Sequence, residues 1–405
     1  MSPTKKLYDN DSYLCNFEAE VLACEKINTT AKADCYAIIL DQSAFFPNQG
    51  GQSSDKGFIW SIKTTDEKHR YAICDVQIDE EGVITHLCTQ PFQTGEHICG
   101  CIDWHHRFSN MQQHTGEHIF SGLVYKYFGY HNVGFHLSKD IITMDYDGFL
   151  STEDLTGLEL ECNHVIIKNI EVKAFYPDSD KLSEYSYRSK KEMQPPIRLV
   201  IINGVDICAC CAPHVHSTGE IGLFKIIDAQ KYKSGTRLSI LCGYRALLDY
   251  HTKQQSVIKI SNLLSVPQSS VTSAVSNLKE ELKKAKDSFI ENEKKLLSLE
   301  LSLIDEIDEI DENVCLITQT HDAVAIRNAL NELVLTHAGY CGIFWSTSEN
   351  EYQFILASRF EDCIQQICAM RIHFDIKGGG KPEMVQGQMH ATQESIQQYF
   401  KNNLH

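Results

Sequence analysis

The chain has 405 residues, 42% of them hydrophobic, and a formal net charge of −17 at pH 7. This length predicts about two to four domains with real hydrophobic cores. The negative charge argues against a protein that binds nucleic acid over its whole surface, because phosphate neutralisation needs lysine and arginine. The sequence has no N-terminal apolar leader and no apolar run long enough to cross a bilayer. We therefore expect a soluble cytoplasmic protein with no membrane partner.

The cysteine pattern fits a reducing compartment. Sixteen cysteines are scattered through periodic segments that look buried, such as those ending in Cys74 and Cys368. Free cysteine is among the most buried residue types, whereas a disulfide framework belongs to short secreted chains. Only the group Cys208, Cys210 and Cys211 indicates chemistry.

Residues 1–103 predict a small domain that resembles a β-barrel. Short runs rich in β-branched residues, such as Tyr36 to Leu40 and Phe58 to Ile62, alternate with turns rich in glycine and asparagine. The turn that follows the first of these runs reads Phe-Pro-Asn-Gln-Gly-Gly-Gln, ending at Gln52.

Residues 104–250 predict an α+β domain with a metal site split between two segments. His114 and His118 are spaced to share one face of a helix, which Ser109 and Gln112 would open as a capping box. Strands are expected at Arg198 to Ile202 and Leu238 to Cys242. Between them, Cys210 and His214 form a Cys-x-x-x-His step, and thiolate plus imidazole suits zinc. Cys208 and Cys211 are rival ligands.

The rest of the chain predicts a helical coiled-coil segment, residues 251–312, and a C-terminal α/β domain, residues 313–405. The first carries an apolar heptad seam with one polar position, Asn292. It could pair with a second chain, giving a homodimer, or with a neighbouring helix. In the second, Gly378 to Gly380 would either let backbone N–H groups approach phosphate or form a tight turn. We expect a strand at Val314 to Thr318 and a helix near Thr392 to Phe400. The seam is formed by Val271, Val275, Leu278, Leu282, Ala285, Phe289, Asn292, Leu296, Leu299 and Leu303.

Taken together, these motifs resemble those of the freestanding alanyl-tRNA editing proteins and of the editing domain of alanyl-tRNA synthetase. The His-x-x-x-His helix, the run from Cys210 to Gly222 and the Gly-Gly-Gln turn all fit that family. The segment Gly378 to Gly387 resembles the C-terminal domain that alanyl-tRNA synthetase shares with DHH-type phosphoesterases, known as DHHA1. The resemblance thus spans nearly the whole chain and implies the long form of the editing protein.

This resemblance implies hydrolysis of tRNA(Ala) that carries the wrong amino acid, chiefly serine and secondly glycine. It implies one Zn²⁺ per chain, with His114, His118 and His214 as the surer ligands and Cys210 as the fourth. Four protein ligands would leave water no position, so the metal's role stays open. Gln52 would contact the serine hydroxyl. Glu117, a departure from the threonine of many synthetases, and Thr218 complete the implied catalytic set.

Basic residues predict where tRNA binds, although a solvated loop would carry the same charges. One group consists of Lys181, Arg188, Lys190, Lys191 and Arg198, and a second of Lys231, Lys233 and Arg237. In the C-terminal domain the candidates are Gly378, Gly379, Gly380 and Lys381.

Two other functions are open. His-x-x-Glu-His is also the inverzincin peptidase motif, in which Glu117 would be the base and Glu184 or Glu192 the third ligand. That hypothesis leaves the run from Cys210 unexplained. The other is a non-catalytic tRNA-binding scaffold. Because the editing region starts near residue 1, without room for aminoacylation modules ahead of it, we expect correction of charged tRNA in trans.

Overall fold

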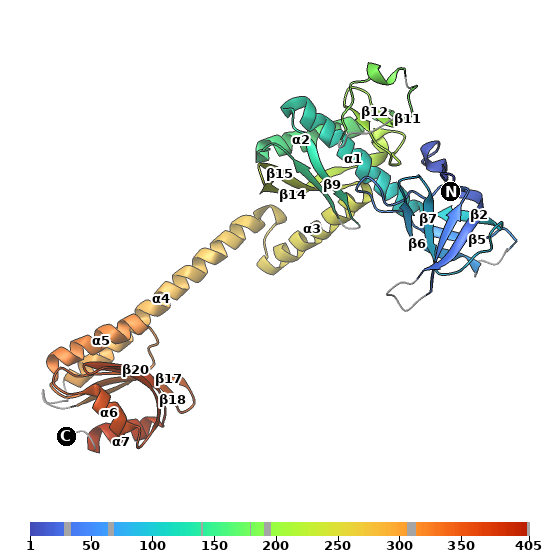
Figure 1. The fold of residues 1–405 in the computed structure, drawn as a ribbon. Coiled ribbons are helices and arrows are strands. Elements are labelled where there is room, and N and C mark those ends of the chain that lie inside the picture. The colour runs from blue at the N-terminus through green and yellow to red at the C-terminus, as the bar shows by residue number, and fades with distance from the viewer. Residues whose placement is uncertain are drawn as a thin grey trace. The chain divides into compact units, whose positions relative to one another are not determined.

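A computed structural model describes residues 1–27, 34–63, 69–138, 141–178, 180–189, 196–305 and 313–402. The chain divides into two compact units, Met1–Ser256 and Val257–His405, each of which mixes helices with sheets (Figure 1). Within the described residues, no helix has both the length and the apolar character that crossing a bilayer requires.

The first unit begins with a closed six-stranded barrel. Its strands follow the order β2-β3-β7-β6-β5-β8, and closure leaves the sheet without an exposed edge. Alternate residues such as Val21, Ile38 and Ile84 point inward and are fully buried. The short strands β1 (Lys5–Lys6) and β4 (Gln42–Ser43) pair beside it. The barrel strands are β2 (Asn16–Ile27), β3 (Cys35–Leu40), β5 (Gly57–Ser61), β6 (Tyr71–Ile78), β7 (Ile84–Cys88) and β8 (His97–Ile102).

Helix α1 (Trp104–Phe128) follows the barrel directly, and the predicted capping box is wrong. The helix begins five residues earlier than Ser109, because the side chain of Asp103 accepts a hydrogen bond from the N–H of His106. Ser109 instead accepts a hydrogen bond from Arg245. At the other end, Gly129 adopts a left-handed conformation with φ of 71° and ends the helix.

Two sheets and a second helix pack around α1. One sheet has the order β14-β15-β10-β9, and the other the order β11-β12-β13. The elements are β9 (Asn132–Leu137), β10 (Ile142–Tyr146), α2 (Thr152–Ile167), β11 (Val172–Phe175), β12 (Leu199–Ile202), β13 (Asp206–Ala209), β14 (Phe224–Tyr232) and β15 (Gly235–Cys242). Short 3₁₀ turns lie at Leu7–Asp9, Leu182–Glu184 and Thr218–Ile221.

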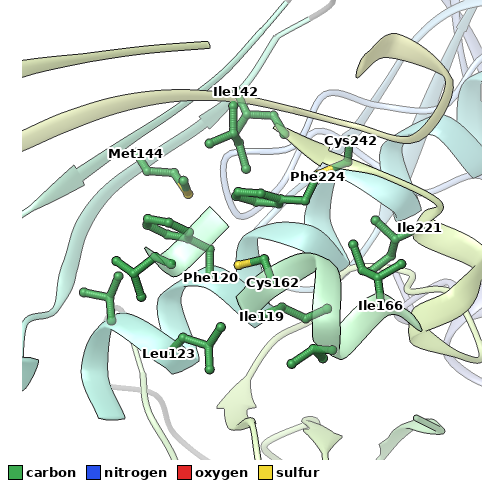
Figure 2. Packing of buried hydrophobic residues seen from close by; sticks show 14 of the residues in the cluster. Ile119, Phe120, Leu123, Ile142, Met144, Cys162, Ile166, Ile221, Phe224 and Cys242 are labelled. Atoms are coloured by element: carbon green, nitrogen blue, oxygen red, sulfur yellow. The ribbon is translucent and has the colours of Figure 1, made fainter. Parts of the chain in front are cut away.

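Small residues let α1 lie close to its neighbours on both sides. A Cβ atom at Gly116 would lie 2.3 Å from Sγ of Cys242 on β15, and one at Gly122 would lie 2.6 Å from the carbonyl oxygen of Val205. Figure 2 shows the core beside them, where Phe120 stacks on Phe224 with ring centroids 5.5 Å apart. Each such buried side chain contributes about 1.5–3 kcal/mol. The helix is therefore held rigidly, which suits it to carry a site.

A buried ion pair joins α1 to the barrel side of this unit. The guanidinium of Arg107 pairs with Asp55 and also donates to the carbonyl oxygen of Ser12, at 2.9 Å. Asp55 in turn accepts from the N–H of Phe46 at 2.6 Å. The turn that carries the Gly-Gly-Gln sequence is thereby fixed beside the helix that carries His114.

The second unit contains a five-stranded sheet with helices on both faces. The strand order is β16-β17-β18-β20-β19, and β16 pairs in parallel with β17. One core joins the sheet to α4 and α5, and the other joins it to α6 and α7. The elements are α4 (Val271–Asp305), β16 (Val314–Thr318), α5 (Ala323–Thr336), β17 (Cys341–Ser348), β18 (Glu351–Ala357), α6 (Cys363–Met370), β19 (Asp375–Lys381), β20 (Met384–His390) and α7 (Gln393–Asn402). Helix α3 (Gly243–Leu264) and a 3₁₀ turn (Gln268–Ser270) precede them.

One prediction for the second unit is wrong, and the predicted heptad seam is found on a single helix. Gly378 to Gly380 do not form a tight turn, since they lie within β19 and pair with β20. The heptad seam does lie on one helix, α4, but it does not pack on the sheet. Leu297 is the buried leucine instead, while seven apolar seam residues are 42–64% exposed.

Candidate metal centre

Four predicted ligands come together in the first unit. His114 and His118 on α1, with Cys210 and His214 from the loop after β13, place one ligand atom each within 4.8 Å of one another. Sγ of Cys210 lies 3.6 Å from Nε2 of His114 and 3.4 Å from Nε2 of His214. The three histidines are buried. The cluster can hold a metal ion.

Each histidine of the cluster is oriented through its other ring nitrogen. Nδ1 of His114 lies 2.8 Å from Oε1 of Gln52, and Nδ1 of His118 lies 3.1 Å from Asp206. Nδ1 of His214 lies 3.0 Å from the hydroxyl of Thr115. Metal-binding histidines usually have such a partner, which fixes the ring and its tautomer. All three Nε2 atoms are thus left for a metal.

The electrostatics of the cluster favour a thiolate. Burial alone would raise the pKa of Cys210, but the His114 charge and hydrogen bonds from the three histidines bring that pKa well below its ordinary value. Burial lowers the pKa of His214 to about 3. Burial also lowers the pKa of His118, but hydrogen bonds to Asp206 and Cys210 outweigh it and raise that pKa to about 9. Metals bind the thiolate and the neutral imidazole, so metal binding would release a proton from His118.

A cavity of about 470 Å³ opens beside the cluster. Gly50 and Gly51 form part of its wall with φ of 62° and 82°, a turn that favours glycine. A Cβ atom at Gly51 would lie 2.6 Å from the carbonyl oxygen of Phe135, so a side chain there would collide with the adjacent β9. The lining residues are Gln49, Gly50, Gly51, His114, His118, Val133, Gly134, Phe135, Ser189, Cys208, Ala209, Cys210 and Cys211.

The three predicted catalytic side chains are all fully buried, and none lines this cavity. Gln52 uses its carbonyl oxygen on His114. Glu117 accepts hydrogen bonds from Ser121 and Asn132, both at 2.7 Å, while its other oxygen lies 4.0 Å from Nε2 of His118.

Thr218 has a structural role. Its hydroxyl donates to the carbonyl oxygen of Val165 and accepts from the N–H of Ile170, both at 2.8 Å. It therefore joins the end of α2 to the segment before β11. This places Thr218 among main-chain contacts, where its hydroxyl is already used.

Two arginines predicted to bind tRNA are engaged in ion pairs. Arg188 binds both oxygens of Asp206, at 2.8 and 2.9 Å. Arg237 binds both oxygens of Asp145, at 2.6 and 2.7 Å, and lies over the ring of Tyr232. Arg198 is buried and donates to the carbonyl oxygen of Ala212. Lys190 and Lys191 lie outside the described residues, and Lys233 lies in the β14–β15 turn.

Sequence reasoning did not find Asp206 or Thr115. Thr115 stands between two predicted ligands, which could have drawn attention to it. Asp206 carries no motif, because strand β13 and not sequence spacing brings it to His118. Of the rival ligands, Cys208 joins a second group with His118 and Asp206, whereas Cys211 joins neither group.

The fold and the site define a protein in which a barrel and a mixed helix–sheet domain form one unit, which carries a cluster able to hold a metal ion. Residues 197–239, which include Cys210 and His214, match the family model of the threonyl and alanyl tRNA synthetase second additional domain. Residues 3–106, which include the barrel, match the model of class II (A) tRNA synthetases.

Comparison with curated relatives narrows this class of protein to one family. The alanyl-tRNA editing protein AlaX-M of Saccharolobus solfataricus is 32% identical over 241 residues, which cover 58% of this chain and 96% of that protein. AlaX-L of Pyrococcus horikoshii is 31% identical, over 60% of this chain and 59% of its own length. An alanine–tRNA ligase of Ignicoccus hospitalis is 30% identical, over 76% of this chain and 34% of the ligase. The chain belongs to the alanyl-tRNA editing protein family. It spans about a third of the ligase that it matches and just under three fifths of AlaX-L.

Proposed function

We propose that this protein hydrolyses the ester bond of tRNA(Ala) that carries the wrong amino acid, chiefly serine and secondly glycine. It would act in the cytoplasm. The observation that carries the proposal is the set of three histidines and one cysteine, of which His114, His118 and Cys210 line a cavity, in a chain of the editing family.

The metal that fits these residues is Zn²⁺, one per chain. Tetrahedral zinc bonded to sulfur and to imidazole nitrogen at ordinary lengths separates the two ligand atoms by about 3.6 Å. The separations from Cys210 to His114 and His214 are 3.6 and 3.4 Å. When bound, zinc would supply a Lewis acid that polarises the ester carbonyl or lowers the pKa of water.

The chain's own groups bind and orient the aminoacyl ester. The cavity accommodates the aminoacyl group beside His114 and His118. The Gly50–Gly51 turn keeps the wall free of side chains, so the backbone can approach the substrate closely. Gln52 holds the ring of His114, and its buried Nε2 has no hydrogen-bond partner among the described residues. The resemblance assigns the serine hydroxyl to Gln52, but in this structure Gln52 does not line the cavity, whereas Gln49 does.

The peptidase hypothesis finds less support. Glu184 is exposed and lies outside the ligand cluster, and Glu192 lies outside the described residues. Glu117 is held by Ser121 and Asn132 in a buried network. An inverzincin requires a glutamate ligand, whereas Cys210 occupies the corresponding place in this cluster.

The test is deacylation of seryl-, glycyl- and alanyl-tRNA(Ala) by the zinc-loaded protein. We expect fast loss of the seryl ester, slower loss of the glycyl ester and a spared alanyl ester. His114→Ala and Cys210→Ser should each reduce the rate by about 100-fold or more, because removal of a ligand releases or displaces the metal. Cys368→Ser, at an exposed cysteine on α6, is the matched control. Zinc binding without deacylation of any of the three esters would favour the scaffold hypothesis.

A further inference from the structure

Asp206 connects a metal ligand to an arginine. Its Oδ2 lies 3.1 Å from Nδ1 of His118, and Arg188 donates to Oδ1 at 2.8 Å and to Oδ2 at 2.9 Å. The side chains of Asp206 and His118 are each 2% exposed, and that of Arg188 is 12% exposed. A charge this deeply buried is costly unless it is paired, so Arg188 stabilises the carboxylate that orients His118.

The backbone of Arg188 is bound to the strand that delivers Asp206. Its N–H donates to the carbonyl oxygen of Ile207 at 2.8 Å, and its carbonyl oxygen accepts from the N–H of Ala209 at 2.9 Å. Arg188 therefore lies along β13 like a short added strand. The next residue, Ser189, lines the cavity beside the metal cluster. The ion pair and the two backbone bonds thus fix one wall of that cavity.

We propose that Arg188 and Asp206 are positioning residues, which couple metal binding at His118 to the order of the cavity wall at Ser189. This inference rests on the proposed function, because the cavity is the aminoacyl-binding site only if the protein hydrolyses aminoacyl-tRNA. A metal on Nε2 makes the Nδ1–H of His118 a stronger donor to Asp206, and the carboxylate makes His118 a better ligand. Coupling of this kind is reciprocal, so the order at Arg188 and the metal affinity rise together.

The chain contains a second arginine–aspartate ion pair, which serves as a control because it does not contact the metal cluster. Arg237 and Asp145 also form a two-bond ion pair, at 2.6 and 2.7 Å, between β15 and β10. Neither residue belongs to a metal-ligand cluster among the described residues. Loss of this pair removes an arginine and an ion pair from the same unit, but should leave metal binding unchanged.

The experiment compares the full-length wild type with Asp206→Asn, Arg188→Gln and Arg237→Gln. Zinc affinity is measured by competition with a chelator, and Co²⁺ absorption reports the ligand geometry. We expect Asp206→Asn to weaken zinc binding by about 10- to 100-fold and to shift the Co²⁺ spectrum, because the carboxylate is the outer partner of a ligand. Arg188→Gln should weaken binding less, and Arg237→Gln not at all.

Hydrogen exchange tests the coupling itself. In the wild type, zinc should slow exchange at the amides of Arg188 and Ala209; in Arg188→Gln the amides at positions 188 and 209 should exchange fast with or without zinc. Unchanged zinc affinity in Asp206→Asn overturns the proposal. So do equal exchange rates at the amides of Arg188 and Ala209 in the wild type with and without zinc. If Asp206→Asn fails to fold, the zinc affinity and hydrogen exchange of Arg188→Gln still test the proposal, since this variant leaves Asp206 in place. A zinc-loaded wild type without deacylase activity would contradict the proposed function while these readouts still stand.

Discussion

Gln49 is the residue from which we expect amino-acid selectivity. It lines the cavity, and its buried Oε1 has no hydrogen-bond partner among the described residues. An unpaired buried acceptor costs about 1–3 kcal/mol, and a donor on the substrate removes that cost. The cavity therefore favours an aminoacyl group with a hydroxyl or ammonium donor within reach of Gln49.

Gln49→Leu should lower kcat/KM by about 5- to 50-fold for esters that use this acceptor, as expected for the loss of one hydrogen bond. Loss for the seryl ester alone would assign the serine hydroxyl as donor, and equal loss for seryl and glycyl esters would assign the ammonium group. The control is Gln93→Leu, at an exposed glutamine between β7 and β8. Unchanged kinetics with both esters would exclude Gln49 from recognition.

At the residue scale, spacing alone could select the ligands but not their surroundings. His114 and His118 follow from the helical period, and Cys210 and His214 from a short step in one loop. Spacing could not show that the carbonyl of Gln52 points at His114. Nor could it show that Arg188 faces Asp206. An arginine near other basic residues is expected to be solvent-exposed, and only the pairing of its segment with β13 places it beside an aspartate.

Among the elements, the barrel contains a titratable group that should make its stability depend on pH. His86 on β7 is fully buried, with Nδ1 3.1 Å from the carbonyl oxygen of Ile38 and Nε2 2.7 Å from the hydroxyl of Ser43. Burial lowers its pKa from 6.5 to about 4. Between these values the unfolded chain binds a proton that the folded barrel does not. Stability is therefore lost as pH falls through 6.5, and this loss levels off below about pH 4.

His86→Gln should remove that loss. Between pH 7 and pH 5, the wild type should lose about 2 kcal/mol more of its free energy of unfolding than the variant. Urea unfolding of the zinc-loaded protein at both pH values measures this difference. His97→Gln, at an exposed histidine on β8, should keep the wild-type dependence. Equal pH sensitivity in the wild type and His86→Gln would contradict the argument.

The elements themselves were predictable to different degrees. The strands at Cys35–Leu40 and Val314–Thr318 lie where β-branched runs predicted them. The start of α1 was misplaced because Asp103 competes with Ser109 as a cap, and Arg245, distant in sequence, occupies the serine. Gly378 to Gly380 suggested a turn, but they lie in a strand. Glycine suits this strand because β20 lies so close that a Cβ atom at Gly378 would be 2.4 Å from the carbonyl oxygen of Gln386.

For the whole molecule, the seam of α4 predicts association of two chains. Its apolar residues repeat in steps of four and three, and Leu282 and Phe289 are 56% and 64% exposed. Exposed apolar heptads of this length are typical of a coiled coil, and burial of each side chain against a partner stabilises by about 1.5–3 kcal/mol. We expect a homodimer through this helix.

Leu282→Lys should convert the dimer into a monomer of 46.0 kDa at micromolar concentration. Light scattering coupled to size exclusion measures the mass. Asp287→Lys introduces the same side chain at an exposed position outside the seam and should leave the dimer intact. A monomeric wild type would exclude the seam as a self-association surface.

The split of the metal cluster between His114 and Cys210 has a consequence for biosynthesis. The two ligands are 96 residues apart in the sequence, so α1 leaves the ribosome with its histidines long before their partners exist. At ordinary rates of synthesis that interval is roughly 5 to 20 s. A zinc finger collects its ligands within one short stretch, whereas here the nascent chain must close a long loop first. Zinc should therefore be acquired late, by a chain whose barrel is already complete.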